Sequence, residues 1–67
     1  MKNKKLKTAM FESEVTHKQA AAILGINSRT FTNKINKRIV NGYEASFTVP
    51  EKTMLAREFN LSVDDIQ

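Results

Sequence analysis

The chain has 67 residues, no cysteine and a formal net charge of +4. A chain this short forms one domain, and its small core cannot also enclose a deep catalytic pocket. Without cysteine it has no disulfide framework and no thiolate metal site. The longest apolar run, residues 20–24, is too short to span a membrane, and the basic N-terminus lacks the apolar stretch of a signal peptide. We therefore expect a single intracellular domain without cofactor or metal.

The charge is distributed unevenly along the chain. Residues 1–42 carry nine Lys/Arg and two acidic residues, which gives +7, whereas residues 43–67 carry two basic and five acidic residues, which gives −3. Such polarity suggests that one face meets a polyanion. The alternative is an ordinary solubility charge with an accidental skew.

Hydrophobic spacing predicts two helices in the first third of the chain. Leu6, Ala9 and Met10 follow helical spacing, which predicts a helix over residues 3–13. Thr16 and Gln19 fit a capping box, so a second helix is expected to begin near residue 17. Gly25 can adopt the left-handed conformation that ends it.

A third helix is predicted directly after this glycine. Asn27 is a strong N-cap, and Phe31 and Ile35 give an inward stripe through about residue 36. Two short helices joined by a tight turn, with Gly25 and a single buried Ile26 in it, form a helix-turn-helix. Ala21 fits a close crossing of the two helices.

The polar surface of this third helix carries side chains that can read a major groove. Arg can donate twice to guanine and Asn can pair twice with adenine. A merely solvated helix would more often carry Glu and Lys, which are better helix formers, although a wet helical hairpin is the alternative. The candidate base-contacting residues are Asn27, Ser28, Arg29, Thr32, Asn33 and Asn36.

The segment after this helix has two interpretations. Asn41-Gly42 between apolar residues predicts a short β-hairpin over residues 38–47. The alternative is an irregular loop in which Ile39, Val40 and Phe47 hold the chain on the core. In both cases we expect basic residues near this end to contact phosphates: Lys34, Lys37 and Arg38.

The remaining sequence predicts support for the bundle. Thr48 and Glu51 form a second capping box with Pro50 in the first turn. The inner face of this fourth helix is expected to comprise Met54, Leu55 and Phe59, with Leu61 after the turn. Ser62 then caps a short fifth turn over residues 63–66, which is counted as the fifth helix of the bundle. The predicted fold is all-α, a small five-helix bundle with a possible short β-hairpin between the third and fourth helices.

The residues 6–36, LKTAMFESEVTHKQAAAILGINSRTFTNKIN, resemble the five-helix DNA-binding domain of phage Cro and repressor proteins, the XRE-type helix-turn-helix family. VTHKQAAAILGI in particular is similar to the family pattern LTQ-x-x-LA-x-x-LGI. The resemblance implies a transcriptional regulator bound to duplex DNA in a bacterial host. It also implies that the start of the second helix, here His17 with Lys18 beside it, contacts phosphate.

Family resemblance also suggests how two copies meet. The C-terminal end often contributes to dimerisation in this family, so Leu61, Val63 and Ile66 are candidate contacts between two copies on a near-palindromic site. The alternative is that they only close the bundle. Phe31 and Ile35 are spaced i, i+4 rather than the usual i, i+3, which leaves open whether Asn33 or Asn36 faces the bases.

Other functional classes remain open or are disfavoured. An excisionase-like or architectural DNA binder would use the same helix and bend its site. An antitoxin or anti-repressor would use residues 47–66 on a protein partner. We expect no enzymatic activity and no small-molecule substrate, because the chain has one His and no glycine-rich phosphate loop, and the adjacent Asp64 and Asp65 cannot form an acid/base pair.

Overall fold

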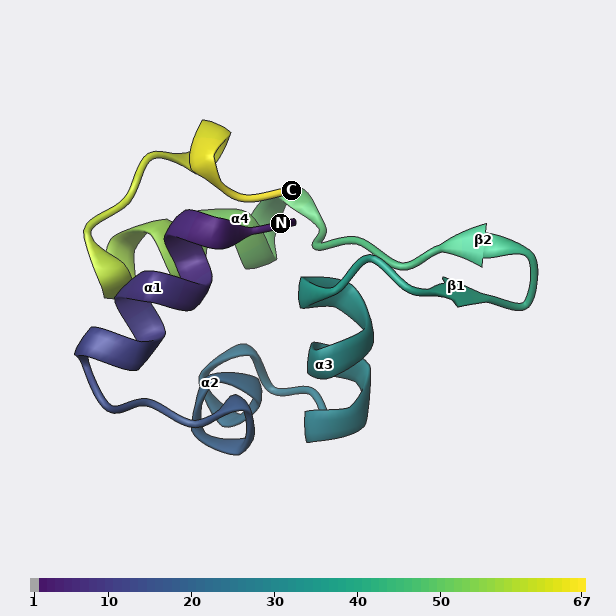
Figure 1. Cartoon of the computed structure of the whole chain (residues 1–67), viewed down its shortest axis with the longest axis horizontal. Coiled ribbons are helices and arrows are strands. Elements are labelled where there is room, and N and C mark those ends of the chain that lie inside the picture. Colours follow the sequence, from purple (N-terminus) through teal and green to yellow (C-terminus); the bar gives the residue numbers. More distant parts are fainter. Residues whose placement is uncertain (1) are drawn as a thin grey trace.

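The computed structural model describes residues 2–67 and is predominantly helical, with a small β-hairpin that projects from the bundle (Figure 1). The elements in chain order are α1 (Lys4–Glu12), α2 (His17–Leu24), α3 (Ser28–Ile35), β1 (Ile39–Val40), β2 (Tyr43–Glu44), α4 (Val49–Phe59) and the 3-10 helix η1 (Val63–Asp65).

The predicted caps begin three of the helices. The Thr16 hydroxyl accepts a hydrogen bond from the Gln19 backbone N–H at 3.1 Å, and the Gln19 side chain accepts one from the Thr16 N–H in return. The same reciprocal pair joins Thr48 and Glu51 at the start of α4. The Asn27 side chain caps α3. Each cap satisfies N–H groups that have no partner within the helix, so these short helices start at defined residues.

One core holds the bundle together. Its buried members are Leu6, Met10, Ala20, Ala21, Phe31, Ile35, Phe47, Leu55, Ala56 and Ile66. Leu24, Ile26, Phe59 and Leu61 pack against its edge. Phe31 packs against Phe47 with ring centroids 5.4 Å apart, which fixes α3 against the start of α4. The expectation that Met54 lies on the inner face is wrong. Met54 is 43% exposed, because Leu55 and Ala56 carry the buried stripe of α4.

The prediction of five helices is also wrong, because the described chain holds four α-helices followed by a single 3-10 turn. Ser62 caps this turn and forms a capping box with Asp65. Ile66 then turns to extended backbone, with φ −114° and ψ 128°. The N–H groups of Asp65 and Ile66 bond to the carbonyls of Ser62 and Val63, three residues back, as in a 3-10 turn. The extended backbone that buries Ile66 in the core then ends the turn.

Asn3 ties the two ends of the described chain to α3. It adopts a left-handed conformation with φ 57° and is almost fully buried. Its side-chain amide donates to the carbonyl oxygen of Ile35 at 2.9 Å, and its Oδ1 accepts from the backbone N–H of Gln67 at 2.7 Å. The Asn3 side chain therefore satisfies a carbonyl at the C-terminus of α3, which has no partner within that helix.

The predicted hairpin is present, with β1 and β2 antiparallel and Val40 opposite Tyr43. Asn41 and Gly42 both have positive φ, 52° and 82°, as a two-residue type I′ turn requires. Phe47 alone of the three expected apolar anchors is buried, whereas the Ile39 side chain is 68% exposed. The strands therefore extend into solvent beside α3 (Figure 1).

Candidate nucleic-acid interface

α2 and α3 form the helix-turn-helix pair that the sequence predicts. Gly25 ends α2 with φ 74°, and the N–H of Ile26 bonds to the carbonyl of Ala21 at 3.0 Å. Nothing lies near the position that a Gly25 side chain would occupy, so the backbone conformation alone explains the glycine. Ala20 and Ala21 are buried, and these small side chains allow α2 and α3 to approach closely (Figure 1).

One side of α3 packs into the core, and the opposite side faces away from the bundle. Phe31 and Ile35 are fully buried. At 100° per residue, Arg29 and Asn33 lie on the side of the helix opposite these two residues. Arg29 is exposed and Asn33 partly exposed. The outward face of α3 therefore carries one guanidinium and one amide, one turn apart.

Several other candidate base-contacting side chains are engaged within the bundle. The Thr32 hydroxyl shares a hydrogen bond of 3.0 Å with Nδ1 of His17. Oδ1 of Asn36 accepts from the Lys7 ammonium at 2.8 Å, and Oδ1 of Asn27 accepts from the Thr30 N–H at 2.7 Å. Within residues 2–67, the members of the predicted set without a side-chain hydrogen bond are Ser28, Arg29 and Asn33.

Some of the expected phosphate-contacting residues are likewise engaged within the bundle, and others are not. The Lys34 ammonium is held by both carboxylate oxygens of Glu51, at 2.8 and 2.9 Å, and its side chain is only 18% exposed. Lys37 pairs with Glu44 at 3.0 Å and is equally covered. Lys18 and Arg38, by contrast, are exposed and form no ion pair among the described residues.

Both acidic partners are stabilised in their charged form. Partial burial raises the pKa of the Glu51 carboxyl, but hydrogen bonds from Lys34 and from the Thr48 backbone outweigh this effect, so the pKa lies below its ordinary value. The hydrogen bond from Lys37 lowers the pKa of Glu44. Each pair therefore stays ionised at neutral pH and reduces the positive charge that these two lysines present to solvent.

A cation that the sequence did not single out lies beside the start of α2. Lys7 on α1 lines a hollow of about 400 Å³ together with His17 and Asn36, with Met10 and Val15 as apolar walls. His17 also packs edge-on against Phe31, at 5.4 Å between ring centroids. Lys7 was missed because its place depends on how α1 crosses the bundle, and helical spacing within one segment does not carry that information.

The expected C-terminal contact surface is mostly used inside the molecule. Ile66 is 2% exposed and belongs to the core, which for this residue agrees with the alternative that it closes the bundle. It is buried because the extended backbone after η1 turns its side chain inward. Leu61 packs against the core edge, and Val63 alone of the three is substantially exposed.

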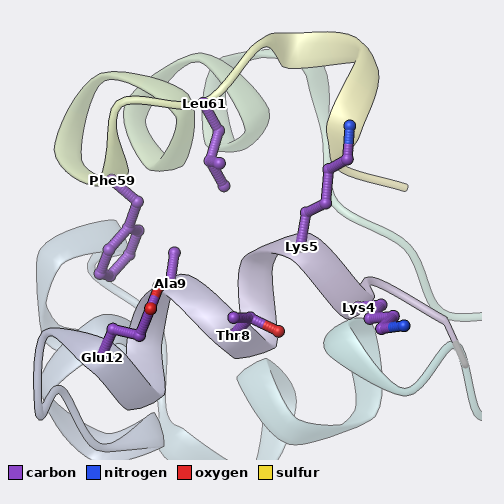
Figure 2. Close-up of a pocket in the computed structure, with 7 residues that line it drawn as sticks. All are labelled: Lys4, Lys5, Thr8, Ala9, Glu12, Phe59 and Leu61. Atoms are coloured by element: carbon purple, nitrogen blue, oxygen red, sulfur yellow. The ribbon is translucent and has the colours of Figure 1, made fainter.

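A second concavity lies between α1 and the end of α4 (Figure 2). It measures about 450 Å³, with Ala9, Phe59 and Leu61 on its apolar side and Lys4 and Glu12 at the rim. Across residues 2–67, no three His, Cys, Asp or Glu side chains gather as metal ligands would. None of the helices in this part of the chain has the length and apolar character needed to cross a membrane.

No protein-family model, curated protein or solved structure matches this chain.

Proposed function

We propose that the chain is a sequence-specific duplex-DNA-binding protein that acts in transcription regulation, with the outward face of α3 in the major groove. In this proposal Arg29 and Asn33 contact base edges, and Ser28 contacts the DNA at the start of the helix. Arg and Asn are the side chains that form bidentate pairs with guanine and adenine, each contributing roughly 1–3 kcal/mol of discrimination.

The single observation that carries this proposal is the division of roles among the α3 side chains. Those facing the bundle are buried, and the flanking Thr32, Lys34 and Asn36 are bonded to neighbouring elements. The face left over bears hydrogen-bonding groups, a guanidinium and no carboxylate. A rigidly supported helix with such a face suits a groove lined by base edges and bordered by phosphates.

The cations around α3 supply the sequence-independent part of the affinity. Lys18 lies beside the start of α2, and Lys7 lines the adjacent hollow. Contacts from these groups to the sugar–phosphate backbone would release condensed counterions, so affinity would fall as salt rises. Lys34 and Lys37 contribute less than their charge suggests, because each is already paired with a carboxylate.

Selection of bound sites from random duplex DNA tests the proposal. The wild-type chain should enrich a consensus, and Arg29→Ala should relax the preference at one base-pair position, at a cost of about 1–3 kcal/mol at that position. Arg57→Ala is the matched control. It removes the same charged group from an exposed site in the last turn of α4, which lies away from α3 (Figure 1).

The form of the consensus tests the proposal that two copies bind together. Two inverted half-sites about one helical turn apart would support a homodimer on DNA. A single short site would support a monomer. Recovery of no consensus, with Arg29→Ala and Arg57→Ala weakening binding equally, would refute base reading by α3.

A further inference from the structure

The β-hairpin presents apolar side chains to solvent although its base is firmly held. Ile39 is 68% exposed and Tyr43 is 80% exposed. At the base, the N–H of Ala45 donates to the carbonyl of Arg38 at 2.8 Å, and the N–H of Arg38 donates to the carbonyl of Asn33 at 2.9 Å. The hairpin is thus attached directly to the last turn of α3 in a fixed direction. An isolated two-stranded hairpin is only marginally stable in water, so its exposed apolar surface suits a binding partner.

The two faces of this hairpin differ in charge. Val40 and Tyr43 are cross-strand partners and therefore share one face, and Arg38 lies on the same face because side chains alternate along a strand. Ile39 and Glu44 share the other face. We call these the Arg38 face and the Glu44 face.

Charge indicates which face can approach DNA. Arg38 is exposed and forms no ion pair within residues 2–67, so its charge is available. The carboxylate on the Glu44 face is still 46% exposed despite its bond to Lys37 and would be repelled by phosphate. Moreover, residues 15–43 contain five Lys/Arg and no acidic residue, so the Arg38 face continues a segment free of negative charge.

The length and direction of the hairpin fit a groove next to the one occupied by α3. It leaves the end of α3 sideways rather than along the helix axis (Figure 1). From Arg38 to the turn at Asn41, three residues at about 3.3 Å each reach roughly 10 Å. A helix centred in a major groove about 12 Å wide lies about 6 Å from the bordering backbone. The hairpin therefore reaches past that backbone to the edge of the adjacent minor groove.

We propose that the Arg38 face of the hairpin binds the DNA minor groove that flanks the major-groove site of α3, with Arg38 and Tyr43 making the contacts. This inference rests on the proposed function, because it takes the position of the DNA from α3. Arg38 lies at the base of the hairpin and extends its guanidinium across the bordering backbone toward the groove. Tyr43, next to the turn, places its ring along the sugars and its hydroxyl within reach of acceptors at the groove floor.

This arrangement has a consequence for sequence preference. A·T pairs present only acceptors in the minor groove, whereas G·C adds a donor. A·T-rich steps also narrow the groove and strengthen its negative potential, which attracts an inserted Arg. The chain should therefore prefer A·T pairs outside the core site, at positions that α3 does not touch.

The test uses two duplexes with the same selected core site, one flanked by A·T pairs and the other by G·C pairs. Affinity is measured by fluorescence anisotropy at several salt concentrations. The wild-type chain should bind the A·T-flanked duplex about tenfold more tightly, the order expected for a groove contact. Arg38→Ala and Tyr43→Thr should each reduce this ratio to about one, and Arg38→Ala alone should lower the salt slope by about one.

Ile39→Thr is the matched control for Tyr43→Thr, because it introduces the same residue at another exposed apolar position, on the Glu44 face, and should keep the wild-type ratio. Flank-independent binding by the wild-type chain, with the core preference intact, overturns the inference and leaves the proposed function standing. A wild-type chain that dimerises without DNA in sedimentation, and loses this association in Tyr43→Thr, overturns it in favour of a contact between copies. Failure to select any core site refutes the proposed function, and the inference falls with it.

Discussion

Replacement of Asn3 by alanine removes a side chain that joins α1, α3 and the C-terminal residue. The substitution deletes the two short hydrogen bonds, to the Ile35 carbonyl at 2.9 Å and from the Gln67 N–H at 2.7 Å. It also leaves the carbonyl without its partner. Alanine must in addition adopt the left-handed backbone at φ 57°, which asparagine tolerates better.

The expected loss of stability is large for a domain of this size. One buried and one partly buried hydrogen bond contribute about 1 kcal/mol each, and the left-handed alanine costs about 1–2 kcal/mol. We therefore expect Asn3→Ala to lower the free energy of unfolding by about 3–4 kcal/mol. A chain of this length has a total stability of about 3–10 kcal/mol, so the variant should lose a third or more of that stability.

Asn60 provides a matched control for the backbone contribution. It has nearly the same φ, 55°, at the end of α4, is exposed, and makes no side-chain hydrogen bond within the described residues. Asn60→Ala should therefore cost only the conformational part, about 1–2 kcal/mol. Asn3→Gly should cost about 2 kcal/mol, because glycine accepts the left-handed backbone but makes none of the side-chain bonds.

Urea unfolding followed by circular dichroism measures all three variants. The difference of about 2 kcal/mol between Asn3→Ala and Asn60→Ala corresponds to roughly 8–16 °C in Tm for a domain of this size. Equal losses in the two alanine variants, within about 0.5 kcal/mol, would mean that the side-chain hydrogen bonds of Asn3 contribute no net stability. The reasoning from those contacts would then be refuted.

Three further predictions concern the turn, the acidic partner and the paired lysine. Gly25→Ala should destabilise the fold by about 1–2 kcal/mol through backbone strain alone, because no atom obstructs the added methyl group, and thermal unfolding measures the loss. The pKa of the Glu51 carboxyl is lower in the folded chain than in the unfolded chain. The contribution of Glu51 to the free energy of unfolding is therefore complete above the unfolded pKa of about 4.3, and it is lost as the pH falls through the folded pKa. Acid titration should therefore show that the stability gap between wild type and Glu51→Gln narrows as the pH falls from 6 to 3, and a constant gap would contradict the assignment. In DNA-binding measurements, Lys37→Ala should lower the salt slope less than Lys18→Ala, because Glu44 already neutralises Lys37; the opposite order would show that the Lys37 pair opens on DNA.

Local signals in the sequence were sufficient to predict the α-helices, the caps of α2, α3 and α4, and the hairpin turn. Thr16, Asn27 and Asn41-Gly42 act on backbone groups a few residues away, so their effect can be read from spacing. The role of Asn3 depends on residues 32 and 64 positions away, and no local pattern reveals it. The prediction of a fifth helix was wrong because it also depended on a distant contact. Burial of Ile66 in the shared core decides where that turn ends.

The candidate site was predicted in kind but not in detail. Composition identified α3 as a polar helix without carboxylates, and that observation needs no tertiary structure. Which of its side chains are available depends on what α1, α2 and α4 bring beside them. Glu51 engages Lys34 and Lys7 engages Asn36, and both partners come from distant parts of the sequence. The prediction from the sequence therefore included more side chains available to contact DNA than the structure leaves without an internal partner.

The hydrogen bond between Asn3 and Gln67 brings the two ends of the described chain side by side. The hairpin turn lies far from both ends (Figure 1). A short peptide that links these ends would therefore lower the conformational entropy of the unfolded chain. It would require little change in the folded structure. New ends opened at the exposed Asn41-Gly42 turn would leave the helices and their packing in the same spatial order. A circular permutant of this kind would separate the hairpin strands covalently and leave the helix-turn-helix unbroken.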